Sequence, residues 1–346
     1  MKEKKIEEWI KKKQDRRSRM TPSEIFDGIR SGESAALSSG ITLVESQLSE
    51  HRALANELIQ LCLPFSGNSI RVGITGVPGV GKSTFIESFG KVLSSMDKKI
   101  AVLAVDPSSG VSGGSILGDK TRMNELSVDQ NVFIRPSAAG DKLGGVARKT
   151  RESILLCEAA GFDYILVETV GVGQSETMVK SMVDFFLLLM LSGAGDELQG
   201  IKKGIMEMAD ALVITKADGD NVKKSKIAAR EYKNAMHLFP PNQNDWIPKV
   251  FTCSAITGEN IKEAIEVIDS FSNHTKLIGS FEMNRKEQDK MWLSETLKEL
   301  ILSDFFGDET LQKELKLNEQ AVLDGKITSF QAAEKIHECY KKKHGI

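Results

Sequence analysis

Cysteine is scarce in this sequence, and its few cysteines are scattered. Only Cys62, Cys157, Cys253 and Cys339 occur among 346 residues, and no two of them stand at the short spacing of a disulfide framework or a zinc knuckle. We therefore expect all four to be small buried hydrophobic residues of a protein in a reducing compartment.

Long apolar runs and an excess of positive charge are also lacking. The most apolar run, residues 185–191, is far too short to cross a bilayer and is typical of a buried strand in a parallel sheet. Residues 1–19 are rich in charge without the apolar core of a secretory signal. The net charge of −2 argues against the basic footprint of a nucleic-acid-binding protein. These absences predict a soluble cytoplasmic protein with no nucleic-acid and no membrane partner.

The most informative stretch is a glycine-rich motif at residues 76–84, which fits the pattern G-x-x-x-x-G-K-[ST]. A mostly apolar, β-branched stretch precedes it, and apolar residues at helical spacing follow it as far as Met96. In a strand, turn and helix of this kind, successive backbone N–H groups and the positive end of the helix face one phosphate group. The motif therefore predicts a nucleotide-binding protein. The predicted contacts are Gly79, Val80, Gly81, Lys82, Ser83 and Thr84.

The rest of the chain divides into three segments by pattern. Residues 1–65 read as a helical extension, in which Thr21 and Pro22 are typical of a helix start. Residues 66–275 alternate strand and helix patterns, which predicts an α/β domain with a mostly parallel sheet covered on both faces. Residues 276–346 are helical again, and their apolar stripes fit either an association arm or helices packed on their own domain. The expected strands are 70–75, 100–105, 131–134, 163–168, 184–191, 210–215 and 248–253.

Carboxylates stand where two of these strands end, on the side of the sheet where ligands bind. Asp106 ends one strand, and the glycine-rich loop after it reaches Asp119, which predicts a sensor of the γ-phosphate. Glu168 ends the other strand, where many nucleotide-binding proteins place a carboxylate near Mg²⁺. With Lys82 as the contact to the terminal phosphates, the predicted catalytic residues include Lys82, Asp119 and Glu168. The predicted Mg²⁺ ligands are Ser83, Asp106, Asp119 and Glu168.

Val172, which follows Gly171 after the strand expected at 163–168, predicts slow hydrolysis. Gly171 is placed to offer its backbone N–H to the γ-phosphate. In small G proteins the next residue is a glutamine that orients water, and here it is Val172. Because an apolar side chain cannot position water, we expect a slow intrinsic rate that a partner or another loop must accelerate.

The identity of the base is predicted by residues 215–218, Thr-Lys-Ala-Asp, after the strand at 210–215. The Asp218 carboxylate can accept hydrogen bonds from the guanine N1–H and amino group, which adenine does not offer. Lys216 would lie along the base, and Ser254 with Ala255, after the next strand, can supply a backbone N–H to guanine O6. The sequence thus predicts GTP rather than ATP. The predicted base contacts are Thr215, Lys216, Asp218, Ser254 and Ala255.

Several long runs in this sequence resemble the MeaB/ArgK family of methylmalonyl-CoA mutase-associated GTPases, which includes the methylmalonic aciduria type A protein. The resemblance covers the nucleotide domain and both helical extensions. It implies a SIMIBI-class G domain in a homodimer joined through the C-terminal arm. It also implies a role in gating adenosylcobalamin loading and in protecting or reactivating an acyl-CoA mutase. The runs that carry it are residues 106–109, 113–123, 168–176 and 193–204.

The resemblance adds one role and exposes one departure. The run 193–204 would be a third switch loop, in which Lys202 is assigned to transition-state help or signalling. Thr215 stands where the family usually has asparagine, and the loss of an amide that ties loops together predicts a lower affinity for GTP.

Two other functions remain open at this point. One is a transport-associated ATPase or kinase, which a preference for ATP over GTP would support. The other is a metallochaperone GTPase for nickel enzymes, which needs clusters of cysteine and histidine that this sequence does not supply.

Overall fold

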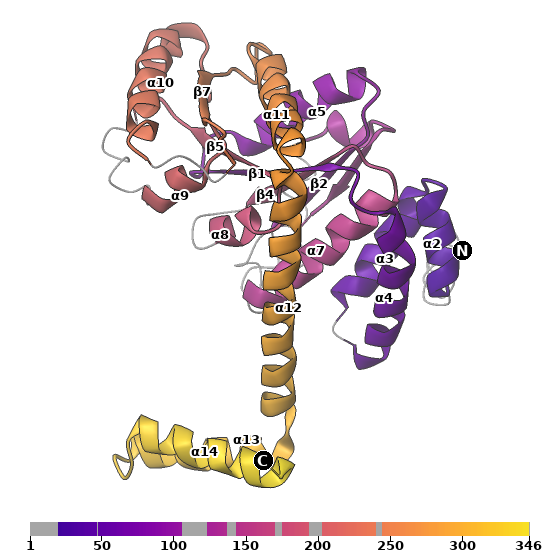
Figure 1. Ribbon diagram of the computed structural model, residues 1–346, viewed down its shortest axis with the longest axis vertical. Coiled ribbons are helices and arrows are strands. Elements are labelled where there is room, and N and C mark those ends of the chain that lie inside the picture. Colours follow the sequence, from indigo (N-terminus) through magenta and orange to yellow (C-terminus); the bar gives the residue numbers. More distant parts are fainter. Residues whose placement is uncertain are drawn as a thin grey trace, which may run out of the picture. The chain divides into compact units, whose positions relative to one another are not determined.

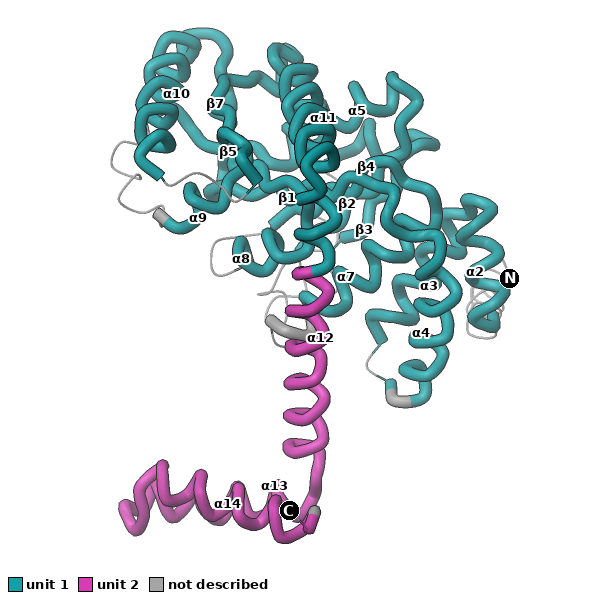
Figure 2. The backbone as a smooth tube through the Cα atoms, in the orientation of Figure 1, with its two compact units in different colours: residues 1–286 teal, residues 287–346 magenta. Residues whose placement is uncertain are grey.

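The protein is built around a seven-stranded sheet, seen in Figure 1 at the centre of the larger part of the chain. The structure is a computed structural model that describes residues 20–46, 48–105, 123–136, 143–169, 175–193, 203–239 and 244–345. By their contacts the residues form two compact units, Met1–Lys286 and Glu287–Ile346, coloured separately in Figure 2. The boundary expected from the sequence, after residue 275, lies inside the last helix that packs on the sheet.

All strand pairs in this sheet are parallel, in the order β3-β2-β4-β1-β5-β6-β7. Strand β1 therefore lies between β4 and β5, and its register places Ile74 beside Glu168. The strands are β1 (Ile70–Gly76), β2 (Ile100–Val105), β3 (Val132–Arg135), β4 (Tyr164–Thr169), β5 (Phe185–Met190), β6 (Ala211–Ile214) and β7 (Lys249–Thr252). The mostly parallel sheet that the sequence predicts is confirmed, and each strand lies within about two residues of its expected position.

Helices cover both faces of the sheet (Figure 1). On one face α5 packs on β1 and β2, and α11 packs on α5 and β5. On the other face α8 lies between α7 and α9 and contacts β1 and β4, while α10 contacts β6 and β7. These helices are α5 (Lys82–Ser95), α7 (Leu143–Ala159), α8 (Ser175–Lys180), α9 (Lys203–Met208), α10 (Val222–Met236) and α11 (Ile261–Leu277). Short 3₁₀ turns are η1 (Leu63–Phe65), η2 (Leu126–Val128) and η4 (Gly219–Asn221).

The N-terminal segment is helical, as predicted, and packs on α7. Its helices are α2 (Pro22–Arg30), α3 (Ser34–Glu45) and α4 (Ser49–Cys62). The Thr21 hydroxyl accepts a hydrogen bond from the Glu24 N–H, while the Glu24 carboxylate accepts one from the Thr21 N–H, so the start of α2 is a complete capping box. Pro22 occupies the first turn, where its missing N–H costs nothing.

A buried cluster of opposite charges fixes the start of β1. The Arg71 guanidinium donates two hydrogen bonds of 2.9 Å to Glu158, whose side chain is fully buried. Arg285, in the first turns of α12 (Ser280–Gly307), donates two hydrogen bonds to Asp184, at 2.8 and 2.7 Å. Burial alone raises the pKa of Glu158, but the hydrogen bonds and charge of Arg71 and the charge of Arg285 outweigh it, so its pKa lies below the ordinary value.

The second unit consists of the rest of α12 followed by α13 (Glu309–Leu323) and α14 (Ser329–His344), which contact each other. Asp308 caps α13, and Thr328 with Gln331 forms a capping box on α14. Large apolar side chains of this unit are exposed, among them Leu293, Leu297, Ile301, Leu317, Leu323 and Phe330. An apolar surface of this kind is typical of an interaction site.

Three of the four cysteines are buried, as predicted, and burial raises the pKa of the Cys62 thiol to about 11 and that of Cys253 to about 12. Cys339 corrects the expectation, because it is only half-buried. It lies on α14, which packs mainly on α13 and through Tyr340 also contacts Phe305 of α12. None of the helices in the described ranges is long and apolar enough to cross a membrane.

Candidate nucleotide site

The glycine-rich motif forms a tight loop between β1 and α5. Gly76, Gly79 and Gly81 have φ angles of 153°, 78° and 96°, which disfavour any other residue. A Cβ atom on Gly76 would lie 2.4 Å from the Leu189 carbonyl oxygen of the neighbouring strand. Lys82 is then the first residue of α5, so the loop and the positive end of the helix face the same space.

Lys82 and Ser83 meet Glu168 at this loop. The Lys82 ammonium donates a 2.8 Å hydrogen bond to the Gly76 carbonyl, and the Ser83 hydroxyl donates one of 3.2 Å to Glu168 Oε1. The pKa of Lys82 lies below its ordinary value, because the effect of burial outweighs the nearby charges of Glu168 and Glu176, which raise it. Glu168 is only 4% exposed, because β4 lies beside β1 and ends at the same edge. The structure thus brings together three of the residues predicted to bind phosphate and metal.

Glu176 is a further residue of this site that the sequence did not single out. It lies in the first turn of α8, is 7% exposed, and its charge acts on Lys82. An acidic residue in the first turn of a helix usually complements the helix dipole at the surface. Nothing in the local sequence distinguishes that common role from a buried carboxylate facing the lysine.

The predicted guanine contacts lie on the other side of the loop, after β6. Lys216 has a left-handed backbone conformation with φ 55°, and its Cε atom lies 3.9 Å from where a Cβ atom on Gly81 would be. The Asp218 carboxylate accepts a 2.5 Å hydrogen bond from the Ser254 hydroxyl. The Ser254 N–H donates to the Glu259 carbonyl, whereas no hydrogen bond among the described residues uses the N–H of Ala255. Ala255 is therefore the better candidate for the contact to guanine O6.

Thr215 connects the predicted guanine motif to the phosphate loop, although threonine lacks the side-chain amide of the asparagine usual at this position. Its hydroxyl donates a 2.7 Å hydrogen bond to the Val80 carbonyl and lies 3.2 Å from that of Met190. Thr215 is 4% exposed, so the bond is protected from water. The expectation that threonine loses the connection between the loops needs correction, because a hydroxyl at this position makes the same kind of bond.

The Thr215→Val variant is expected to bind GTP about tenfold more weakly, because a buried carbonyl of the phosphate loop loses its donor at nearly constant volume. The measurement is an equilibrium titration with a fluorescent GTP analogue. The matched control is Thr215→Ser, which keeps the hydroxyl and should bind within about twofold of the parent. Equal affinity of the valine and serine variants would contradict the role of this bond.

Four predicted site residues lie outside the described residues. They are the predicted Mg²⁺ ligands Asp106 and Asp119, the predicted γ-phosphate contact Gly171 and the predicted catalytic residue Lys202. Val172 also lies outside the described residues. Strand β2, which precedes Asp106, and strand β4, which precedes Gly171, end at the same edge of the sheet as β1.

Comparison with known proteins places this geometry in one family. The family model described as "Methylmalonyl Co-A mutase-associated GTPase MeaB" matches residues 37–310. A "Putative GTPase" of Caulobacter vibrioides is 49% identical over 305 residues, which cover 88% of this chain and 93% of that protein. The "Methylmalonic aciduria type A homolog, mitochondrial" of Mus musculus is 44% identical over 330 residues, 92% of this chain and 80% of its own length. A solved structure described as "Crystal structure of LAO/AO transport system kinase" superposes with a TM-score of 0.73 and 38% identity, covering 92% of this chain and 97% of the other.

Proposed function

The chain belongs to the family of methylmalonyl-CoA mutase-associated GTPases, and from this we propose that it is a nucleotide-switched chaperone of a cobalamin-dependent acyl-CoA mutase. As a member of this family it binds and hydrolyses GTP. The observation that carries the proposal is the match of the family model over residues 37–310, a range that includes the phosphate loop, Glu168 and Asp218. In the proposed role, the chain gates the loading of adenosylcobalamin and protects or reactivates the mutase.

GTP would be held between the phosphate loop and the guanine motif. The N–H groups of residues 79–84 would bind the phosphates, and Lys82 would leave the Gly76 carbonyl to reach the terminal ones. Lys216 would lie along the base while Asp218 accepts its two N–H donors. Because Thr215 connects both halves through Val80, a ligand that orders one half favours order in the other.

Mg²⁺ is proposed as the metal of this site, and the residues present fit it. The Ser83 hydroxyl and the Glu168 carboxylate lie 3.2 Å apart beside the phosphate loop, and both are hard oxygen donors. Asp106 and Asp119 are proposed as further ligands, direct or through water. When bound, the ion would neutralise charge on the phosphate oxygens. The chain's own contribution is to hold these oxygens and Lys82 at one edge of the sheet.

Hydrolysis without a partner is expected to be slow. Val172 occupies the position where a water-orienting glutamine is found in small G proteins, and an apolar side chain gives water no hydrogen bond. Lys202, in the proposed third switch loop, would then supply charge when a partner orders that loop. Slow hydrolysis suits a switch, since each nucleotide state lasts long enough to be read by the client.

The C-terminal arm is proposed to join two copies of the chain in a homodimer. Its exposed apolar side chains, among them Leu293, Leu297 and Ile301, supply a surface that water disfavours. The client is proposed to be an acyl-CoA mutase such as methylmalonyl-CoA mutase.

The test of the proposed function is binding of a purified cobalamin-dependent acyl-CoA mutase in defined nucleotide states. We expect the complex to form with an affinity that differs between GDP and a non-hydrolysable GTP analogue, and we expect adenosylcobalamin transfer to the mutase, followed by its absorbance, to require GTP. Lys82→Ala serves as the control, because it should remove the nucleotide dependence without altering the fold. If no such mutase bound in either state, the chaperone role would fail while the GTPase activity would stand.

A further inference from the structure

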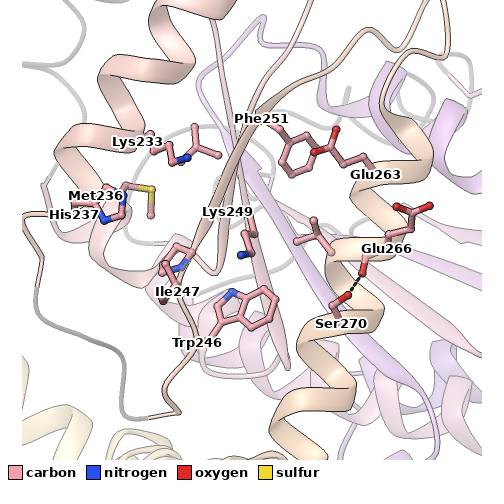
Figure 3. A pocket seen from close by; sticks show the side chains of 13 residues that line it. Lys233, Met236, His237, Trp246, Ile247, Lys249, Phe251, Glu263, Glu266 and Ser270 are labelled. Atoms are coloured by element: carbon pink, nitrogen blue, oxygen red, sulfur yellow. Dashed lines mark hydrogen bonds between the residues drawn. The ribbon is translucent and has the colours of Figure 1, made fainter.

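A groove runs along the free edge of the sheet, away from the nucleotide site. Figure 3 shows it between α10 and α11, with β7 as its floor. Its volume is about 600 Å³, and none of the 13 lining residues belongs to the proposed nucleotide site. The lining residues are Lys233, Met236, His237, Trp246, Ile247, Pro248, Lys249, Val250, Phe251, Glu263, Glu266, Val267 and Ser270.

The floor of the groove offers backbone groups that have no partner strand. The Lys249 N–H donates to the Asp210 carbonyl just before β6, and the Cys253 N–H donates to that of Ile214 at its end. The alternate residues Val250 and Thr252 therefore turn their backbone groups to the open edge. The Asn260 side chain already donates to the Thr252 carbonyl at 2.9 Å. By the same alternation, the N–H and the carbonyl of Val250 point away from β6. An edge of this kind accepts an additional strand.

The walls of the groove carry opposite charges. The α10 wall presents Lys233, with Lys249 beside it on the strand, and the α11 wall presents Glu263 and Glu266. Burial raises the pKa of Glu263, and the neighbouring charge of Glu266 raises it further, so this wall would be stabilised by a cation. The floor adds an apolar surface, in which Ile247 is 65% exposed.

From this arrangement we infer that the groove binds an extended segment of a partner protein as an eighth strand beside β7, with acidic side chains toward α10 and basic side chains toward α11. Successive side chains of a strand point to opposite faces, so the charged residues of the segment would alternate between acidic and basic, and an apolar residue would lie over Ile247. Pro248 and Lys249 limit pairing along the rest of this edge, as such residues commonly do. The charges of the walls then decide which segment enters.

The experiment is a selection of phage-displayed random decapeptides on the full chain, followed by affinity measurement of the enriched peptides. We expect the peptides to alternate acidic and basic residues and to lose at least about tenfold in affinity for the Lys233→Glu variant. Lys223→Glu is the matched control, because it makes the same change on α10 outside the groove and should leave peptide affinity unchanged. Val250→Pro removes the outward N–H without breaking a bond to β6, and it should abolish binding while GTP affinity is kept.

Three results would overturn the inference. One is the absence of enriched peptides, and another is an equal affinity of these peptides for the parent, Lys233→Glu and Val250→Pro chains. The third is a change of molecular mass of the Val250→Pro variant in light scattering, since this would show that a second copy of the chain pairs with β7. If Val250→Pro does not fold, the comparison of Lys233→Glu with Lys223→Glu decides alone.

Discussion

Replacing Asp218 with asparagine is expected to weaken GTP binding by up to ~10⁴-fold and to create affinity for xanthosine triphosphate. Guanine presents two donors, N1–H and the amino group, which the Asp218 carboxylate would accept together. Asparagine keeps one acceptor but turns its second group into a donor, which faces the guanine amino group. Xanthine has a carbonyl in place of that amino group, so its hydrogen bonds match asparagine instead.

Asparagine is the informative replacement because it leaves the neighbouring loop in place. The Ser254 hydroxyl donates to the Asp218 carboxylate, and it can also donate to the carbonyl oxygen of an asparagine side chain. A loss of affinity then reports the missing contact with the base and not a displaced loop. Alanine at this position would leave the Ser254 hydroxyl without its acceptor and mix the two effects.

The measurement is a set of competitive titrations with GTP, xanthosine triphosphate and ATP on the parent and the Asp218→Asn chain. The affinity for ATP serves as the internal control, since adenine makes neither contact and should respond little to the change. Tighter binding of ATP than of GTP by the parent chain would favour the alternative of a transport-associated kinase, the activity after which one similar structure is named. An unchanged affinity for GTP in the variant would remove Asp218 from the site.

The sheet could be predicted from the sequence because its strands are buried on both faces. Strand β5 is completely buried and appears in the sequence as an unbroken apolar run, which is typical of a strand in a parallel sheet. The rule that ligands lie beyond the carboxyl ends of parallel strands then located the site without any knowledge of the strand order. Glu168 beside Ser83 is a direct result of that rule.

What the sequence could not predict are contacts between residues far apart in the chain. The bond from Thr215 to Val80 joins residues 135 positions apart, and a lone threonine after a strand gives no sign of it. Glu158 and Arg285 lie within helical patterns, in which charged residues normally face water. Their contacts depend on how α7 and the start of α12 meet β1, and local periodicity carries no information about that.

The pairing of Arg285 leads to the largest expected effect on stability. Its guanidinium donates to the Asp184 carboxylate and also to the carbonyls of Gly67 and Ser69, at 2.7 and 2.8 Å. The side chain of Asp184 is only 2% exposed. Removing the arginine leaves the Asp184 charge without its cation, with only the Arg71 N–H still donating to it, and removes a donor from both carbonyls. Arg285→Ala is therefore expected to lower the free energy of unfolding by about 3–5 kcal/mol.

The measurement is urea-induced unfolding of the unit that contains the sheet, and the midpoint of its transition reports the free energy of unfolding. Lys290→Ala is the matched control on the same helix, because Lys290 and Glu287 form an exposed pair and its loss should change the stability by no more than about 0.5 kcal/mol. An Arg285→Ala chain as stable as this control would show that the buried cluster adds nothing to the fold.

Acidity supplies a second test of the same cluster. The pKa of Glu158 is lowered by Arg71 and Arg285 in the folded chain, so the stabilisation by Glu158 is complete above its unfolded pKa of about 4.3 and is lost as the pH falls through the folded value. Arg285→Ala removes one of the two cations, and this part of its cost exists only while Glu158 is charged. The difference in unfolding free energy between parent and variant should therefore shrink as the pH falls below about 4.3 and through the folded pKa of Glu158. A purely steric defect would cost the same at every pH.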